Sequence, residues 1–487
     1  MTIKELLKGV DYQVQQGGLD REVSALVYDS RKAEKDCAFV CISGAVADGH
    51  KFVSQVSEEG PALIVAEHEI EAAEDVTVVI VDNSRPALAY MSANYFGHPA
   101  EKLKLIGVTG TKGKTTTTYM VKTMLEAAGH KVGLIGTIET VIGDVHTPAL
   151  NTTPESYILH ESFAEMVKAG CDAVVMEVSS QAFKLDRTAG ILFDIGVYTN
   201  LAPDHIGANE HASFEEYRDC KAMLFRQCRL GIGNIDDEHY DEIFRDATCE
   251  KMTYGFSEKA DLRASNEQLV ARDDYLGICY DLSGVLNMRV DVDMPGDFSA
   301  YNSMAAIAVG LQFGATPEII DETMKNLHVR GRVQRVETGR ECTLLVDYAH
   351  NAMALESLLV TLRKYEPKRL VCIFGCGGNR SKDRRFEMGE VSGRLADLSI
   401  ITSDNPRFEE PEAIIEDIKT GIGRTDGEYV TIIDRADAVR YALEHYQKGD
   451  VIVLAGKGHE DYQEIRGVKH HMDEVELVEA ARRALDA

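Results

Sequence analysis

The stretch LKLIGVTGTKGKTTTTYM, residues 103–120, decides the fold of the middle of this chain. Its apolar start predicts a strand, its glycines predict a tight turn, and the residues from about Thr115 predict a helix that ends at Gly129. A second apolar run, KVGLIGTIET, follows the helix. The order strand, glycine loop, helix, strand predicts a βαβ unit and therefore a parallel α/β sheet.

The glycine loop predicts a phosphate-binding site. Gly110 and Gly113 let the backbone fold so that its N–H groups point at a phosphate. Lys114 supplies a positive charge to the β- and γ-phosphates, and Thr115 offers a hydroxyl to Mg²⁺. The loop is shortened, because Val108 stands where the familiar motif has its first glycine. A glycine-rich turn without a ligand is the alternative, and the flanking strand and helix argue against it.

The composition narrows the possible functions. A chain of 487 residues is too long for one ordinary core, so two to four domains are expected. The formal net charge of -28 opposes binding to nucleic acid, because phosphate contacts need an excess of Lys and Arg. The sequence has no run of 18 apolar residues and no apolar signal region, so no membrane insertion is expected. The ten cysteines form no C-x-x-C pair, which favours reduced thiols and a cytoplasmic protein.

Hydrophobic patterning divides the chain into three α/β regions. Residues 1–98 carry short apolar runs broken by Gly and Asp and predict a small N-terminal α/β domain. Residues 99–330 hold the glycine loop and predict a central parallel sheet like that of P-loop ATPases. From Gly331 the alternation of strands and helices restarts, so residues 331–487 predict a doubly wound, Rossmann-like C-terminal domain.

Polar residues follow two buried strands of the central region. Glu177 ends the strand in AVVMEVSS, and His205 lies in TNLAPDHIG, just past the next strand. The carboxyl ends of parallel strands meet at one edge of a sheet, so both side chains are candidates to complete a Mg²⁺ shell. Taken alone, they could equally be a solvent-facing glutamate and an ordinary loop histidine.

A series of motifs resembles the Mur ligase family, and most closely its MurE type. The motifs occur in the family's order: YDSRK, GTKGKTT, NTTPE, MEVSS, TNLAPDH, YN, GR, DYAH, DNPR and GKGHEDYQ. They extend from residue 28 to residue 463 and are specific as a set. The resemblance implies the shortened loop and an ATP-dependent amide ligase. In that reaction, ATP phosphorylates a carboxylate, and an amine then attacks the acyl phosphate.

The resemblance also assigns site residues. It implies four catalytic residues, namely Lys114, Glu177, His205 and Lys221, the last as a carbamylated lysine. It implies that Mg²⁺ is held by Thr115, Glu177, His205 and the Lys221 carbamate. It implies that ATP, the co-substrate, is bound by Gly110, Thr111, Lys112, Gly113, Lys114, Thr115, Thr116, Asn302, Arg332 and Asp347. Without the family, Lys221 would be interpreted as a surface helix residue, and Lys112 as an exposed charge.

Two further residue sets concern the substrates, which the resemblance implies are small molecules bound by a monomer. The UDP-N-acetylmuramoyl dipeptide would be bound by Ser30, Asn151, Thr152, Thr153, Ser179 and Arg187. The incoming amino acid would be bound by Arg380, Asp404, Asn405, Pro406, Arg407, Gly456 and Glu460. Ser30 on its own would be interpreted as a turn or cap residue.

The motif DNPR indicates which amino acid is added. In this family it accompanies meso-diaminopimelate, whose distal carboxylate suits a bidentate guanidinium such as that of Arg407. The same guanidinium would repel the ammonium of lysine. The expected reaction therefore adds meso-diaminopimelate to UDP-N-acetylmuramoyl-L-Ala-D-Glu in peptidoglycan precursor synthesis.

Several alternatives stay open. The same ligase could add L-lysine, which Arg407 argues against. A paralogue with another acyl acceptor is a second alternative, because Gln181, Leu185, Asn351 and Ser381 depart from the family pattern. A folylpolyglutamate synthetase would share the shortened loop but would not explain YDSRK or DNPR. A P-loop switch or motor fits poorly, because no switch signature is evident.

Overall fold

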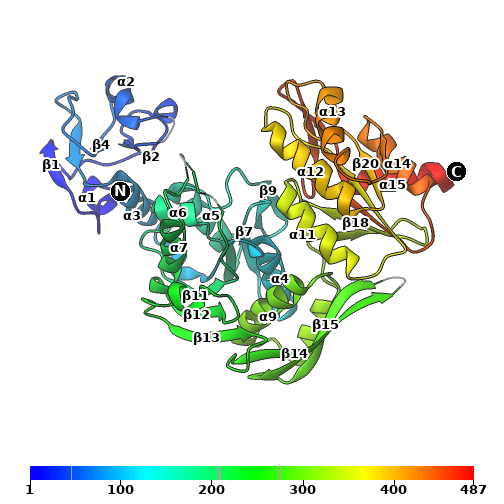
Figure 1. The fold of residues 1–487 in the computed structure, drawn as a ribbon. Coiled ribbons are helices and arrows are strands. Elements are labelled where there is room, and N and C mark those ends of the chain that lie inside the picture. Colours follow the sequence, from blue (N-terminus) through cyan, green and yellow to red (C-terminus); the bar gives the residue numbers. More distant parts are fainter. Residues whose placement is uncertain (45–46, 205, 208–209, 273–274, 487) are drawn as a thin grey trace. The chain divides into compact units, whose positions relative to one another are not determined.

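The computed structural model describes residues 1–44, 47–204, 206–207, 210–272 and 275–486. The chain forms two compact units (Figure 1). The first comprises residues 1–263 and 304–316, and the second comprises residues 264–303 and 317–487. Within the described residues, no helix combines the length and the apolar character needed to cross a membrane.

The N-terminal part of the first unit is a five-stranded sheet in the order β1-β5-β4-β3-β2. Strands β2 to β5 are parallel, and β1 is antiparallel to β5. The elements are α1 (Ile3–Leu6), β1 (Gln13–Gln16), β2 (Leu26–Val27), η1 (Ser30–Lys32), β3 (Ala38–Val40), η2 (Gly49–Phe52), α2 (Val53–Glu58), β4 (Leu63–Ala66), β5 (Thr77–Ile80) and α3 (Ser84–Tyr95). The β4 strand is buried on both faces, as its uninterrupted apolar sequence predicts.

A parallel sheet forms the centre of the first unit, as predicted. β6 lies between β10 and β11, and these strands are flanked by β7 on one side and by β12 and β13 on the other. The strands are β6 (Lys104–Thr109), β7 (Val132–Ile135), β10 (Ala173–Glu177), β11 (Phe193–Tyr198), β12 (Cys228–Asn234) and β13 (Glu250–Gly255). The helices are η3 (Pro99–Lys102), α4 (Lys114–Ala127), α5 (Ser156–Lys168), α6 (Ser180–Lys184), α7 (Phe214–Ala222), η4 (Met223–Arg226) and α8 (Tyr240–Ile243).

One predicted strand, KVGLIGTIET, is two strands in the structure. β7 ends at Ile135, and β8 (Glu139–Ile142) turns back antiparallel to it, followed by β9 (Val145–Pro148). The break lies at Gly136, where an added Cβ would stand 2.7 Å from Oε1 of Glu177. The turn therefore brings the backbone close to a buried carboxylate, which a continuous strand would not do.

The second unit contains a six-stranded sheet in the order β17-β18-β22-β19-β20-β21. All its strands are parallel except β17 at the edge, which confirms the doubly wound prediction. The strands are β17 (Gln334–Val336), β18 (Thr343–Asp347), β19 (Arg369–Phe374), β20 (Leu398–Ile401), β21 (Tyr429–Thr431) and β22 (Asp450–Ala455). A separate hairpin joins β23 (Tyr462–Ile465) to β24 (Val468–His471).

Helices cover both faces of this sheet. One core packs α11 (Ala352–Arg363), α12 (Lys382–Leu395) and α13 (Pro411–Ile422) against it, and a second packs α14 (Arg435–Glu444) and α15 (Glu474–Asp486). The preceding elements are β14 (Leu262–Arg272), β15 (Tyr275–Gly284), β16 (Met288–Val292), α9 (Asp297–Gln312) and α10 (Pro317–Lys325). The α/β fold class is therefore confirmed, with a sheet in each predicted region, while the domain boundaries at residues 98 and 330 stay a prediction.

Candidate active site

The shortened loop joins β6 to α4 in a conformation that needs glycine. Gly110 has a φ of 147°, and a Cβ there would lie 1.9 Å from Oγ1 of Thr199. Two residues that directly follow β11 bind the loop. The Lys112 N–H donates to Oδ1 of Asn200 at 2.9 Å, and the Thr199 hydroxyl donates to the Lys112 carbonyl at 2.7 Å. The loop is thus shaped by the protein itself. Both residues belong to the motif TNLAPDH, but the sequence did not indicate that they support the loop.

The ammonium group of Lys114 lies over the backbone of the loop. Lys114 Nζ donates to the carbonyl oxygens of Gly110 at 2.9 Å and Thr111 at 3.1 Å. Thr115 and Thr116 are buried in the first turn of α4, while Lys112 is exposed. Backbone N–H groups at a helix N-terminus and a nearby ammonium form an anion-binding arrangement.

Glu177 is buried beside this loop and is fully engaged. It pairs with Val108 across the β10–β6 ladder, and only 1% of its surface is exposed. Its Oε1 accepts from the Thr115 hydroxyl at 3.0 Å and from the Thr137 N–H at 2.8 Å, and its Oε2 accepts from the Thr137 hydroxyl at 3.0 Å. These donors offset the cost of burying a carboxylate. Thr137, which lies in the unpredicted turn after β7, had no sequence signal.

The donor chemistry here fits Mg²⁺. The Glu177 carboxylate and the Thr115 hydroxyl are hard oxygen ligands 3.0 Å apart, at the mouth of a phosphate-binding loop. The described residues hold no group of three His, Cys, Asp or Glu side chains arranged for a metal. His205, the other predicted ligand, lies outside the described residues.

Lys221 is buried rather than exposed. It lies on α7 with 1% of its surface accessible, and its Nζ donates to the Gly110 carbonyl at 2.7 Å. The amine also stands 4.4 Å from the ring centre of Tyr217. Burial, reinforced by the charge of Lys114, lowers the pKa of Lys221 well below its ordinary 10.5. The structure thus brings Lys221 to the phosphate loop and favours its neutral amine.

Four residues predicted to bind the sugar and peptide gather next to Glu177. The Thr153 hydroxyl donates to the Glu177 carbonyl at 2.9 Å and accepts from the Ser179 N–H at 3.1 Å. Arg187 donates to the Thr153 carbonyl at 2.8 Å, and the Thr152 hydroxyl lies 3.1 Å from that of Thr137. The neighbouring Asn151 is exposed.

Ser30, predicted to contact uridine, begins η1 in the N-terminal sheet region of the same unit. Its neighbour Asp29 caps that turn by accepting from the Arg31 N–H. The ring of Tyr28 lies 5.9 Å from the ring of Tyr157 on α5, so this segment packs against the central part of the unit. The structure shows no side-chain partner for the Ser30 hydroxyl among the described residues.

In the second unit, the predicted nucleotide residues Arg332 and Asp347 lie together. The Arg332 guanidinium lies 4.9 Å from the ring centre of Tyr348. Asp347, at the end of β18, accepts from the N–H groups of Val333 at 2.8 Å and Ala349 at 2.9 Å. Burial raises the pKa of Asp347. Asn302 is buried on α9.

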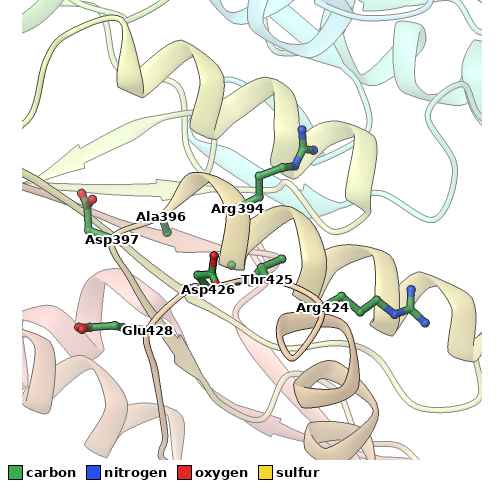
Figure 2. Close-up of a pocket in the computed structure, with 9 residues that line it drawn as sticks. Arg394, Ala396, Asp397, Arg424, Thr425, Asp426 and Glu428 are labelled. Carbon is green, nitrogen blue, oxygen red and sulfur yellow. Dashed lines mark hydrogen bonds between the residues drawn. The ribbon is translucent and has the colours of Figure 1, made fainter.

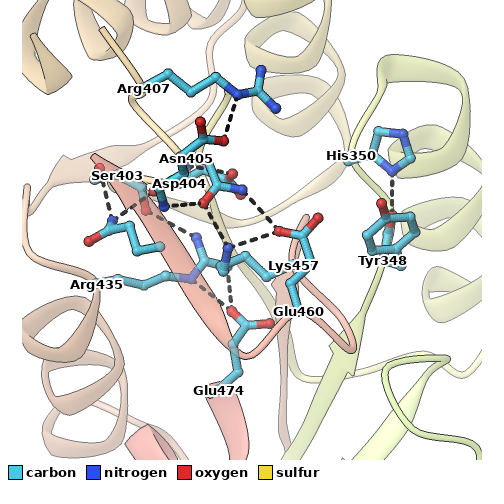
Figure 3. Close-up of polar contacts among 12 residues, drawn as sticks. Tyr348, His350, Ser403, Asp404, Asn405, Arg407, Arg435, Lys457, Glu460 and Glu474 are labelled. Carbon is cyan, nitrogen blue, oxygen red and sulfur yellow. Dashed lines mark hydrogen bonds and ion pairs between the residues drawn. The ribbon is translucent and has the colours of Figure 1, made fainter. Parts of the chain in front are cut away.

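Four of the residues predicted to bind the incoming amino acid lie together in the second unit, namely Asp404, Asn405, Arg407 and Glu460 (Figure 3). Asn405 donates from Nδ2 to Oε2 of Glu460 at 2.9 Å, and its Oδ1 accepts from Lys457 Nζ at 3.2 Å. Lys457 also pairs with Oε2 of Glu460 at 3.0 Å and is fully buried. Gly456 stands close to Asp404, because a Cβ there would lie 3.0 Å from Oδ2. Lys457 was not predicted as a site residue.

Arg407 and Arg380 approach the same glycine, Gly377. A Cβ built on Gly377 would lie 3.6 Å from Arg407 Nη1 and 3.9 Å from Arg380 Cγ. Arg380 is exposed, whereas Pro406 is buried. Arg407 borders a pocket of 690 Å³ that also includes Pro406 and Ser403 in its lining. Two guanidinium groups next to a carboxylate–amide pair could hold a zwitterion with an additional carboxylate.

A second pocket, of 530 Å³, lies elsewhere in the same unit (Figure 2). Its lining runs from the end of α12 to the segment after α13 and includes Arg394, Asp397, Arg424 and Glu428. None of the predicted site residues lines it. Two of its arginines are already paired, Arg394 with Glu356 and Arg424 with Glu390.

The chain is similar to known families and to individual known proteins. Family models match the Mur ligase middle domain over residues 108–310 and the Mur ligase, glutamate ligase domain over residues 331–458. UDP-N-acetylmuramoyl-L-alanyl-D-glutamate--2,6-diaminopimelate ligase 1 of Clostridium acetobutylicum is 43% identical over 481 residues, which are 98% of each chain. The ligase of that activity from Geobacillus thermodenitrificans is 39% identical over 95% of each chain.

Solved structures are also similar to this chain. A structure of a UDP-N-acetylmuramoyl-L-alanyl-D-glutamate--2,6-diaminopimelate ligase matches with a TM-score of 0.74 and 28% identity, covering 100% of this chain and 99% of that one. A folylpolyglutamate synthase from Mycobacterium tuberculosis matches with a TM-score of 0.58, but at 17% identity and over 76% of this chain. That second likeness shows a shared fold alone.

Proposed function

The chain belongs to the Mur ligase family, and from this membership we propose that it adds meso-diaminopimelate to UDP-N-acetylmuramoyl-L-Ala-D-Glu. The reaction is an ATP-dependent amide ligation that yields ADP and phosphate. The observation that carries the choice of amino acid is Arg407, at 3.2 Å from Glu464 and beside the Asn405–Glu460 pair. A guanidinium in that position suits a substrate with a second carboxylate.

In the first step, the acceptor carboxylate attacks the γ-phosphorus of ATP, and ADP leaves. The loop N–H groups and Lys114 bind the phosphates, and the Thr137–Glu177–Thr115 contacts keep the loop edge in place. Bound Mg²⁺, held by Thr115 and Glu177, with His205 as a further ligand, would neutralise phosphate charge during this approach. Asn302, Arg332 and Asp347 would also bind the nucleotide.

In the second step, the amine of the incoming amino acid attacks the acyl carbon, and phosphate leaves with one oxygen of the former carboxylate. Glu460 would bind the substrate ammonium, and Arg407 and Arg380 its carboxylates. Thr152, Thr153, Ser179 and Arg187 would hold the sugar-dipeptide at the first unit, with Ser30 at the uridine. No enzyme nucleophile is needed.

Lys221 would act as a carbamate. A neutral, buried amine is the form that adds CO₂, and the product is a carboxylate that can serve as a metal ligand. The lowered pKa of Lys221 and its contact with the phosphate loop support this role. Neighbouring Tyr217 would fix the side chain through its ring.

We also propose that the protein works as a monomer in the cytoplasm, with domain boundaries near residues 98 and 330. All ten cysteines are free thiols, which suits a reducing compartment. The sheets of the three proposed domains differ in strand order, and each has its own apolar core.

The function is tested by ADP and phosphate release from the purified protein with ATP, Mg²⁺ and the UDP-dipeptide. Diaminopimelate and L-lysine are supplied separately. Turnover with diaminopimelate alone is expected. Turnover with lysine alone would overturn the specificity, and silence with both would indicate a paralogue with another acceptor. Labelling the acceptor carboxylate with ¹⁸O tests the acyl phosphate, because one label should appear in the released phosphate.

A further inference from the structure

Glu464 of strand β23 binds the Nε edge of the Arg407 guanidinium. Arg407 Nε donates to Oε2 of Glu464 at 3.2 Å, which Figure 3 draws as the dashed line leaving the labelled Arg407. Arg407 Nη1 donates to the Gly378 carbonyl at 2.9 Å. Both side chains of the ion pair are a quarter exposed. The pair is therefore accessible to a ligand yet partly shielded from water.

The backbone of Glu464 contacts the same turn twice more. Its N–H donates to Oδ1 of Asn405 at 2.8 Å, and its carbonyl accepts from the Arg407 N–H at 3.0 Å. Arg407 has a φ of 52°, a left-handed conformation that is unfavourable for a side-chain-bearing residue. Such a conformation persists where surrounding contacts impose it. Two backbone bonds to the β23–β24 hairpin do so, because the Arg407 carbonyl also accepts from the Arg466 N–H at 2.6 Å.

The Asn405 amide is oriented by the same strand. Its oxygen accepts from both the Glu464 N–H and Lys457 Nζ, so its NH₂ group must face Glu460. Glu464 thus contacts the turn at the Asn405 amide oxygen, at the Arg407 N–H and at the Arg407 guanidinium. The proposed function assigns a substrate carboxylate to Arg407 and the substrate ammonium to Glu460, to which the Asn405 amide donates.

The Glu464 contact also limits how a ligand can approach Arg407. A guanidinium has five N–H donors, and those on Nε and one on Nη1 are already engaged. The remaining hydrogens lie on the two terminal nitrogens. A ligand carboxylate must therefore approach the end of the guanidinium rather than its Nε edge, and Glu464 fixes where that end lies.

We propose that Glu464 is a positioning residue that sets the selectivity for an amino acid with a distal carboxylate. It acts by fixing the orientation of the Arg407 guanidinium. The inference rests on the proposed function, because it concerns how Arg407 recognises the substrate. Glu464 need not touch the substrate itself. Its removal should weaken recognition of the distal carboxylate and leave the phosphoryl-transfer chemistry intact.

The test compares Glu464→Ala and Glu464→Gln with the wild type. In Glu464→Ala, KM for diaminopimelate should rise about tenfold while kcat stays within about twofold, since ground-state and transition-state binding of that carboxylate are lost together. kcat/KM for L-lysine, which lacks the distal carboxylate, should not fall. Glu464→Gln should largely restore KM, because its amide oxygen can accept from Nε. Glu390→Ala, which breaks the surface pair with Arg424, is the matched control and should change neither substrate's kinetics.

A double-mutant cycle separates positioning from a general structural role. In an Arg407→Ala background, Glu464→Ala should have no further effect on KM for diaminopimelate. An unchanged KM in Glu464→Ala, or equal losses in the presence and absence of Arg407, would overturn the inference.

The same experiment separates failure of this inference from failure of the function. If the wild type prefers diaminopimelate and Arg407→Ala abolishes that preference, the proposed function stands whatever Glu464 does. If the wild type does not use diaminopimelate, the proposed function fails, and the role of Glu464 fails with it.

Discussion

Replacing Lys221 by methionine should nearly abolish activity and leave the protein as stable as before. Methionine has about the same length and fills the same buried space without an amine. In the wild type, Lys221 Nζ donates to the Gly110 carbonyl at 2.7 Å. That carbonyl also accepts from Lys114 Nζ at 2.9 Å, so it keeps a partner in the variant. No buried acceptor is left unsatisfied.

The expected change in stability is small because two effects oppose each other. Losing one net hydrogen bond costs about 1 kcal/mol. Replacing a buried amine by an apolar group gains about 1 kcal/mol, judged from the burial of one methylene-sized group. For a unit of this size, a net change below about 1 kcal/mol shifts Tm by less than about 4 °C. Activity should fall at least about 100-fold, the usual effect of removing one preorganised electrostatic group.

Three measurements on the variant make the test specific. Calorimetry gives Tm, and release of ADP in the presence of both substrates gives kcat. NMR in ¹³C-bicarbonate should show a carbamate carbon in the wild type and none in Lys221→Met. Lys251→Met is the matched control, because Lys251 also donates to a carbonyl, that of Phe244 at 3.2 Å, and also lies over an aromatic ring. It should keep full activity.

Lys221→Ala adds a rescue test. The truncated side chain leaves a cavity next to the phosphate loop, into which acetate or formate could fit and supply the missing carboxylate. Partial recovery with these anions, and none in Lys221→Met, is expected. A Lys221→Met protein with more than about a third of wild-type kcat would refute the reasoning, since a lost electrostatic group costs far more.

Three further predictions follow from single residues. Glu177→Gln should lower kcat about 100-fold, because an amide cannot accept from all the donors that now surround both carboxylate oxygens; steady-state kinetics checks this. Gly456→Ala should raise KM for the amino acid about tenfold without changing KM for ATP, because Gly456 has a φ of 119° and its Cβ would stand 3.0 Å from Asp404 Oδ2. Burial, together with the charge of His98, lowers the pKa of His160 to about 4 in the folded protein. As the pH falls below about 6.5, His160 therefore takes up a proton in the unfolded state but not in the folded state. This protonation of the unfolded state should lower the free energy of unfolding by about 2 kcal/mol at pH 5. His160→Leu should therefore raise Tm at pH 5 more than at pH 7.

Much of the fold follows from local sequence, because parallel strands buried on both faces are recognisable as apolar runs. β6 and β10 lie where the runs LKLIGVTG and AVVMEVSS predicted them. The turn at Gly136 was missed because KVGLIGTIET has no turn residue other than glycine, and its cause is a contact with Glu177 about 40 residues away. The β23–β24 hairpin was missed because its residues alternate only weakly between apolar and polar.

The residues of the candidate site likewise divide into those that local sequence predicts and those that it does not. The loop glycines follow from the pattern of strand, glycine turn and helix, and Glu177 was a candidate because it ends a buried strand. The burial of Lys221 could not, because a lysine within a polar helix segment ordinarily faces water. The supporting residues Thr137, Lys457 and Glu464 act through contacts between distant segments. Glu464 meets Asn405 and Arg407 across 57 to 59 residues, a proximity that no local pattern encodes.

A competition experiment tests the central claim most directly. The protein receives ATP, Mg²⁺ and UDP-N-acetylmuramoyl-L-Ala-D-Glu with equal concentrations of meso-diaminopimelate and L-lysine, and mass spectrometry identifies the UDP-linked product. The account predicts one product, whose mass equals that of the acceptor plus diaminopimelate minus water. A product carrying lysine, or consumption of ATP without any amide product, would contradict it.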